Sequence, residues 1–284
     1  MSGVLLIAGQ ALREGLRRRV FAVVVGLTLL FGVLYAYGVA QLFEDVDSFG
    51  AGGKGLDATS LAGATILGLA MFGTLFLGTV LAAFLTIGAV RGDAERGLLQ
   101  PVVVRPLGRP AYLLGRWLAA AAVSAGYVLV VYLGAVLVTG LIGGWWPDRV
   151  VLPGLELALA AAVVAALGVL GSTLLGATAN GIAILMTFGA GLLAGLLGQI
   201  GDALGSHTLS RIADVASWAL PFEALYQDAL RQLVADVGGV AGAIVQLGPL
   251  GGSRSAGLLL VPYLVVYLLV IGGLAVASFS RRDL

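Results

Sequence analysis

Residues 157–201 read LALAAAVVAALGVLGSTLLGATANGIAILMTFGAGLLAGLLGQIG, a run of 45 residues without Asp, Glu, Lys or Arg. As one helix the run would be about 67 Å long, more than twice the hydrocarbon thickness of a bilayer, which is roughly 30 Å. We therefore expect it to cross a membrane twice and to fold back within residues 177–181, Ala-Thr-Ala-Asn-Gly, where Asn and Gly favour a turn. This stretch predicts a helical integral membrane protein.

The rest of the chain has the same character. Its 284 residues are 60% hydrophobic and 11% charged, whereas a soluble domain has about 25% charged residues. Four further uncharged runs, at 20–43, 58–90, 117–147 and 255–280, are each long enough to span once. We predict an all-α fold in a single domain over 1–284, with six transmembrane helices at about 20–41, 62–90, 114–142, 155–177, 181–200 and 258–279.

The distribution of basic residues predicts the orientation. Cytoplasmic segments of membrane proteins are enriched in Lys and Arg. If the N-terminus is cytoplasmic, eleven basic residues lie inside and five outside. The inside set is Arg13, Arg17, Arg18, Arg19, Arg91, Arg96, Arg105, Arg109, Arg116, Arg281 and Arg282, and the outside set is Lys54, Arg149, Arg211, Arg231 and Arg254. Six spans then place both termini in the cytoplasm.

Two segments outside the spans have amphipathic patterns. Residues 1–19 predict a helix lying on the membrane, with Leu5, Leu12 and Leu16 on one face and basic residues on the other. The apolar run that follows is longer than that of a signal peptide, so we expect it to be an uncleaved span. Residues 202–254 predict two short amphipathic helices at the outer surface, interrupted at Pro221, which cap the bundle or dock an external partner.

The composition gives little support to a catalytic or metal-binding role. The chain has no cysteine and one histidine, His207, so we expect no transition-metal site and no pairing of Ser172 with a membrane-embedded base. The net charge of +1 gives no reason to expect nucleic acid as a partner. Ionisable groups are missing from the predicted spans except for Glu156 at the edge of the fourth, which we interpret as an interfacial residue. Proton-coupled transport is therefore not expected.

The segment 91–110 is the one predicted cytoplasmic loop in which both charges mingle. Asp93 and Glu95 alternate with Arg91 and Arg96, a pattern that positive-inside orientation does not require and that suits a surface facing another protein. Three prolines, at 101, 106 and 110, prevent one continuous helix and predict a short helix followed by a turn.

This loop resembles the segment between the second and third spans of type 2 ABC exporter permeases. The matching residues, in order and spacing, are Asp93, Glu95-Arg96-Gly97, Arg105-Pro106-Leu107-Gly108-Arg109 and Gly115-Arg116. Leu98, Gly108 and Arg116 stand where the family usually has Thr, Ser and Lys. The basic segment before the first span and Leu220-Pro221-Phe222-Glu223 are also similar to the family, and the pattern is closest to the six-span permease of the copper-processing system that matures nitrous-oxide reductase.

The resemblance implies a transport subunit of a bacterial or archaeal plasma membrane. Two such chains, identical or different, would enclose a pathway above a separate ABC ATPase, which would bind the ATP and Mg. The sequence agrees in having no G-x-x-x-x-G-K-[ST] motif of its own, so we expect no cofactor on this chain. The residues implied to couple to the ATPase are Arg91, Asp93, Glu95 and Arg96, supported by Arg105 and Arg109.

Hydroxyl groups within the spans have two interpretations. Thr74, Thr79 and Thr86 in the second span, with Tyr127 and Tyr132 in the third, would line a weakly polar pathway for an amphipathic or hydrophobic cargo. Alternatively, they bond backbone carbonyls or neighbouring helices. The other class of protein that fits the sequence is an ATP-independent membrane carrier or scaffold.

Overall fold

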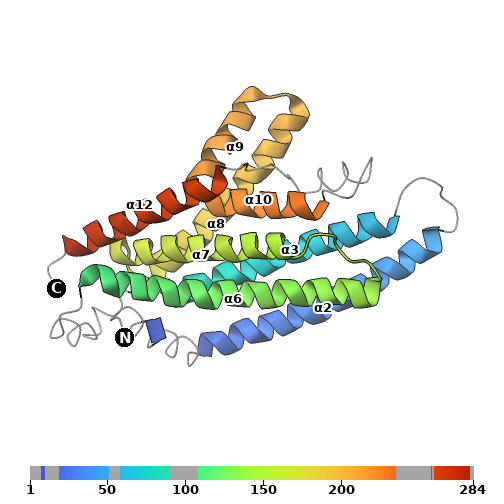
Figure 1. The fold of residues 1–284 in the computed structure, drawn as a ribbon, viewed down its shortest axis with the longest axis horizontal. Coiled ribbons are helices and arrows are strands. Elements are labelled where there is room, and N and C mark those ends of the chain that lie inside the picture. The colour runs from blue at the N-terminus through green and yellow to red at the C-terminus, as the bar shows by residue number, and fades with distance from the viewer. Residues whose placement is uncertain are drawn as a thin grey trace.

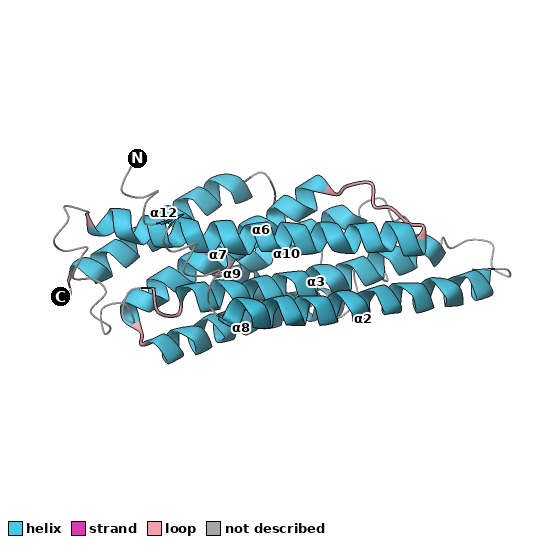
Figure 2. Cartoon of the chain, turned by 90° about the horizontal axis from the view of Figure 1, so that it is seen from below, coloured by secondary structure: helices cyan, strands magenta, loops and turns pink. Residues whose placement is uncertain are grey.

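The computed structural model describes residues 8–9, 19–50, 58–89, 108–234, 257 and 259–281. Regular structure in these residues is helical, and six helices are long and apolar enough to cross a membrane (Figures 1 and 2). The six are α2 (Arg19–Gly50), α3 (Ala58–Thr86), α6 (Arg109–Gly143), α7 (Val151–Leu174), α8 (Ala177–Leu204) and α12 (Leu260–Ser280). The predicted all-α membrane fold with six spans is confirmed. The predicted interfacial helix over 1–19 lies almost wholly outside the described residues.

The bundle is organised around α7 and α3. In the most apolar part of each helix, 72% of the α7 residues and 67% of the α3 residues are buried, against 17% in α2 and in α12. α7 packs against α3, α6, α8 and α12, so the uncharged sequence that decides the fold also forms its centre. The beginnings of α2 and α6 and the end of α12 lie toward the same end of the bundle (Figure 1). We call this the loop end, because the predicted coupling loop joins α3 to α6 there.

The fold-back between α7 and α8 lies close to its predicted position but uses other residues. α7 ends at Leu174, and Leu175 and Gly176 form the turn with extended backbone. Asn180 and Gly181, which we expected to form it, already lie in the first two turns of α8. The prediction of an Asn-Gly turn is therefore wrong in its residues, because an extended pair reverses the chain without the positive φ that Asn and Gly favour.

Two glycine pairs with the spacing of close helix packing, Gly191 with Gly195 and Gly140 with Gly144, have different roles in the structure. Gly191 and Gly195 face α10 (Pro221–Val234): a methyl group on Gly191 would lie 2.7 Å from Cζ of Phe222, and one on Gly195 2.3 Å from Oε1 of Glu223. This GxxxG therefore packs helices within the chain. In the other pattern, Gly144 instead ends α6, with a φ of 68° that favours glycine.

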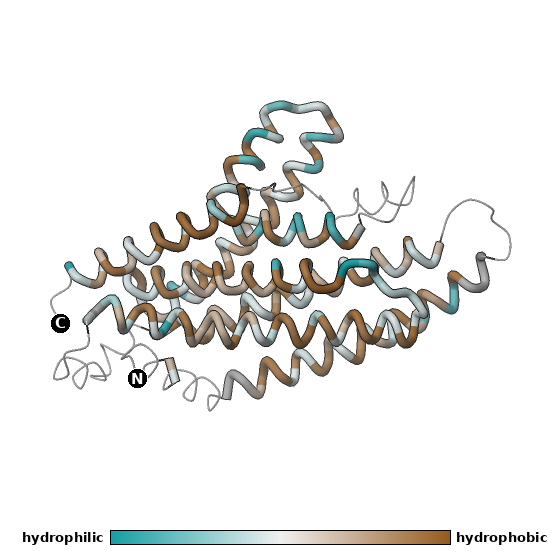
Figure 3. The backbone as a smooth tube through the Cα atoms, in the orientation of Figure 1, coloured by the Kyte–Doolittle hydropathy of each residue, from teal (hydrophilic) through white to brown (hydrophobic). Residues whose placement is uncertain are grey.

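Only one of the two helices expected at the outer surface has an exposed apolar face. α9 (His207–Ala219) leaves the bundle with the end of α8 as a hairpin (Figure 1), and its Ile212 and Val215 are exposed. Nearly all described side chains of α10 are instead buried, although its polar residues gather along one side (Figure 3). α10 therefore packs onto the bundle, which fits the interpretation that this segment caps it, and its place at the outer membrane surface stays a prediction.

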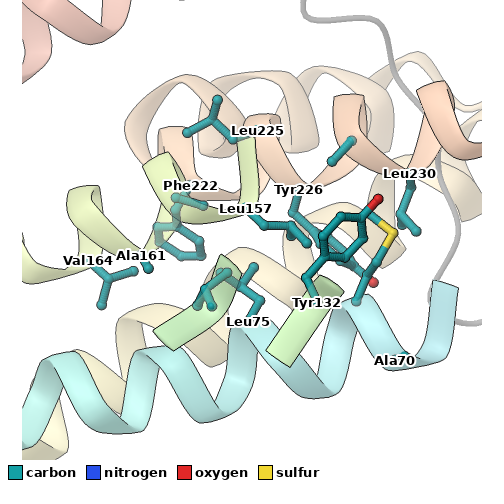
Figure 4. Close-up of a cluster of buried hydrophobic side chains, with 14 of the residues drawn as sticks. Ala70, Leu75, Tyr132, Leu157, Ala161, Val164, Phe222, Leu225, Tyr226 and Leu230 are labelled. Atoms are coloured by element: carbon teal, nitrogen blue, oxygen red, sulfur yellow. The ribbon is translucent and has the colours of Figure 1, made fainter. Parts of the chain in front are cut away.

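α10 completes the hydrophobic core. Phe222, Leu225, Tyr226 and Leu230 extend from it toward α3, α6 and α7 (Figure 4). Each of these four side chains is at most 4% exposed. Burial of a large apolar side chain contributes roughly 1.5–3 kcal/mol, so this row is a substantial part of what holds α10 in place.

Candidate functional site

Most of the predicted coupling residues lie outside the described part of the chain. These are Arg91, Asp93, Glu95, Arg96 and Arg105. Arg109 is the first residue of α6, and only its backbone is described. The structure does describe both ends of the loop, Ala89 and Gly108, and therefore shows how the loop is anchored.

The two ends of the loop are joined through the carbonyl oxygen of Ala89. The Tyr112 hydroxyl donates a hydrogen bond to this oxygen at 2.8 Å, and Arg116 Nε donates to it at 3.3 Å. Arg116 Nε also lies 3.3 Å from the Tyr112 hydroxyl, and the guanidinium carbon lies 5.8 Å from the centre of the Tyr112 ring. We call Ala89, Tyr112 and Arg116 the loop clasp.

The local sequence explains the geometry of the loop clasp. Tyr112 and Arg116 are four residues apart and therefore lie on the same face of α6, one turn apart. Pro110, in the first turn of α6, fits there because proline has no N–H to leave unpaired. On the other side, Ala89 N donates to Thr86 O at 3.1 Å in the turn that follows α3. The backbone on both sides of the loop is thus held at fixed positions.

Asn180 connects the same region to two further helices. Its Nδ2 donates to Thr86 O at 3.3 Å and to Gly168 O at 3.0 Å, so this side chain of α8 links α3 and α7. Asn180 is fully buried, and a methyl group on Gly171 would lie 2.1 Å from its Oδ1. Because Thr86 O accepts from both Asn180 and Ala89, hydrogen bonds run without a break from α8 to the loop clasp.

α12 also contacts the loop clasp. The rings of Tyr112 and Phe279 are 6.2 Å apart, within a small apolar cluster that includes Leu113, Val169 and Ala275. Helices α3, α6, α7, α8 and α12 therefore meet around the anchored loop. A displacement of the loop would be transmitted to all five, because packed interiors have low compressibility.

Of the residues proposed to line a pathway, Thr74, Thr79, Thr86 and Tyr132 are buried within the chain and Tyr127 is half-buried. Thr86 Oγ1 donates to Ala82 O at 2.8 Å, and the hydroxyls of Tyr127 and Thr28 are 2.5 Å apart, which joins α6 to α2. The oxygens of Thr74, Thr79 and Tyr132 are buried without a hydrogen-bond partner among the described residues. Thr86 and Tyr127 therefore fit the interpretation as helix-packing residues, while the pathway role of the five stays a prediction.

Sequence reasoning missed the buried carboxyl groups around α10. Glu223 and Asp228 are 2% and 8% exposed, and Gln232 Nε2 donates to Oε1 of Glu156 at 2.7 Å. Glu156 is therefore engaged with α10, and its position at the membrane interface stays a prediction. The available signal was the series of polar residues on one face of α10, which we interpreted as facing solvent.

Comparison with known proteins agrees with this architecture. The model of a family described as "ABC-2 family transporter protein" matches residues 5–284. The probable ABC transporter permease protein NosY of Stutzerimonas stutzeri is 37% identical over 131 residues, which are 46% of this chain and 43% of that protein. The match thus spans less than half of the curated relative. The family match covers nearly all of the chain, and we conclude that the chain belongs to the ABC-2 family of transporter proteins, as a multi-pass membrane permease subunit.

Proposed function

We propose that this chain is the permease of an exporter that moves its substrate across the plasma membrane of a bacterium or archaeon. The energy would come from ATP hydrolysed on a separate ATPase subunit, which would carry the ATP and Mg. The relative NosY is itself named as a probable ABC transporter permease, which supports this assignment. The observation that carries the proposal is the loop clasp, because it joins both ends of the predicted coupling loop to the bundle.

The mechanism follows from the anchored loop. Arg91, Asp93, Glu95 and Arg96 would contact the ATPase through complementary charges, with Arg105 and Arg109 supporting that surface. Closure of the ATPase pair on ATP would push on the loop. The loop clasp would pass this displacement to α3 and α6 together, and Asn180 would extend it to α7 and α8. A bundle of two permease chains would then change from inward-facing to outward-facing.

The same proposal assigns the partners. The second permease chain would be either an identical copy or a related chain, and lipid would cover the exposed apolar faces of α2 and α12. An external protein would dock on α9, which carries exposed apolar residues.

The experiment is purification of the full chain from its native membrane in mild detergent, followed by identification of bound proteins. We expect a P-loop ATPase to co-purify. The Glu95→Arg variant should still insert into the membrane as the unmodified permease does. In the reconstituted complex, however, ATP hydrolysis should no longer drive transport. Persistent absence of an ATPase would favour the ATP-independent carrier or scaffold instead.

A further inference from the structure

The contact between α7 and α10 contains two carboxyl groups bridged by one amide. Gln232 Nε2 donates to Oε1 of Glu156 at 2.7 Å and to Oδ2 of Asp228 at 3.0 Å. Gln232 is 3% exposed, so this bridge is buried between the helices. We call Glu156 and Asp228 the α7–α10 carboxyl pair.

The carboxyl pair has more acceptor atoms than donors. Glu156 Oε2 and Gln232 Oε1 are buried and have no hydrogen-bond partner among the described residues. The two carboxyl groups lie side by side, because the same Gln232 Nε2 donates to both of them. Two carboxylate ions cannot form a hydrogen bond, since both are only acceptors, whereas a carboxylic acid can donate to a carboxylate.

Asp228 is the member of the pair that carries the negative charge. Arg231 lies one turn further along α10, and its Nε and Nη2 are 3.0 and 2.9 Å from Oδ1 of Asp228. Burial raises the pKa of Asp228, but hydrogen bonds from Arg231, Gln232 and Glu156 lower it more, so that its pKa is below the ordinary value. Glu156 is thus the group left to hold a proton.

Few other charges in the described structure act on Glu156. α7 and α3 carry no other titratable side chain, and α8 carries only Asp202. α9 contributes His207, Arg211 and Asp214, and α10 itself adds Glu223, Tyr226 and Arg231. The other described titratable side chains on elements that pack against α7 are Tyr112, Arg116, Tyr127 and Tyr132 of α6, Tyr263 and Tyr267 of α12, and Asp148 and Arg149 just before α7. The charges that influence Glu156 directly are those of Asp228 and Arg231. With one proton on the pair, the group of two carboxyls and one guanidinium is neutral.

We propose that Glu156 and Asp228 bind one proton between them, and that this shared proton holds α10 against α7. Loss of the proton places two negative charges side by side in a mostly apolar contact, where a single Arg231 cannot balance both. The two carboxylates then repel each other across the α7–α10 interface. α10 separates from α7 in alkaline solution and exposes the core residues beneath it.

The test uses the lack of cysteine in the chain, because any introduced cysteine is then the only one. Ala229→Cys places a small thiol on a fully buried position of α10, and Val215→Cys places one on the exposed surface of α9. The full chain in lipid nanodiscs is labelled with a membrane-impermeant maleimide between about pH 6 and about pH 10. The labelling rate at position 229 is divided by the rate at position 215, which removes the intrinsic reactivity of the thiol. All samples carry Glu223→Gln, because ionisation of that buried carboxyl would also act on α10.

The relative labelling rate should rise by up to about tenfold per pH unit and should level off once the pair has lost its proton in the closed contact. Glu156→Gln, which cannot ionise, should keep the rate low throughout, while Asp148→Asn, an exposed carboxyl just before α7, should leave the rise unchanged. A rate that does not rise, or that rises equally in Glu156→Gln, overturns the proposal.

If the cysteine variant does not fold, infrared spectroscopy of the Glu223→Gln chain replaces labelling. A protonated carboxyl band that Glu156→Gln abolishes supports the proposal, and a spectrum without that difference overturns it.

Discussion

Tyr112 donates its hydroxyl hydrogen to the carbonyl oxygen of Ala89 over 2.8 Å, which joins the start of α6 to the turn after α3. The 22 residues between them, 90–111, include the predicted ATPase contact, and this segment is therefore joined to the bundle at both ends. This relationship makes the loop suited to transmit a displacement from a bound ATPase.

Tyr112→Phe should weaken coupling without abolishing assembly. The ring contact with Phe279 is retained, whereas the hydroxyl's hydrogen bonds to Ala89 O and from Arg116 Nε are lost, at a cost of about 1 kcal/mol each. We expect lower transport per ATP hydrolysed in the reconstituted complex. Tyr37→Phe, at an exposed position of α2, is the matched control and should behave as the unmodified chain. Equal coupling ratios in the two variants would show that these hydrogen bonds have no part in transmission.

Asn180→Leu should destabilise the loop end of the bundle. The substitution keeps a side chain of similar size but removes the two hydrogen bonds that Asn180 donates to the carbonyls of Thr86 and Gly168, each worth about 1 kcal/mol. The apparent melting temperature in detergent should fall. An unchanged melting temperature would mean that these carbonyls do not depend on Asn180.

Gly191→Ala should displace α10. The new methyl group would lie 2.7 Å from the ring of Phe222, which is fully buried and stacked on Phe188 at 5.7 Å. The ring cannot move aside without disturbing the core, so we expect overpacking to cost about 1–3 kcal/mol. Gly189→Ala, in the same helix but with open space around it, should be neutral or slightly stabilising. Similar thermal stability of the two variants would contradict the close α8–α10 packing.

Glu223 should make stability depend on pH. Burial raises its pKa to about 7 from 4.5, although a hydrogen bond from Gln227 lowers it in part. Because the folded chain holds this proton more tightly than the unfolded chain, its stabilising effect is complete below pH 4.5 and is lost as the pH rises to about 7. The loss is at most about 3 kcal/mol.

The measurement for Glu223 is the apparent melting temperature across this pH range. With Glu156→Gln present in every sample, Glu223→Gln should remove the decline, whereas Glu44→Gln, at an exposed position, should keep it. A decline that persists in Glu223→Gln would assign the pH dependence to another group.

The six spans could be predicted because a long apolar stretch without charged residues is stable in the lipid bilayer rather than in water. Lipid leaves no alternative to a helix once about 20 apolar residues follow one another, so residues 157–201 predicted two helices correctly. The placement of α10 was not predictable in the same way. Its amphipathic pattern fits a membrane surface as well as a polar contact inside a bundle, and only the partner helices distinguish the two.

The contacts of the loop clasp could not be predicted from the sequence either. Arg116 was recognised as part of a family pattern, but its acceptor is a backbone carbonyl, which every residue possesses. No spacing in the sequence could identify Ala89 as that acceptor. Asn180 was noticed for its turn chemistry, whereas its role depends on carbonyls 12 and 94 positions away.

The central claim is that the loop 91–110 contacts a separate ATPase, and cysteine cross-linking tests it most directly. Glu95→Cys and Lys54→Cys, each the only cysteine in its chain, are treated in native membranes with a short heterobifunctional cross-linker that attacks neighbouring amines. We expect position 95 to give an adduct that mass spectrometry identifies as a P-loop ATPase, and position 54, on the predicted external side, to give none. An ATPase adduct from position 54, or none from position 95 in membranes that contain the assembled complex, would contradict the account.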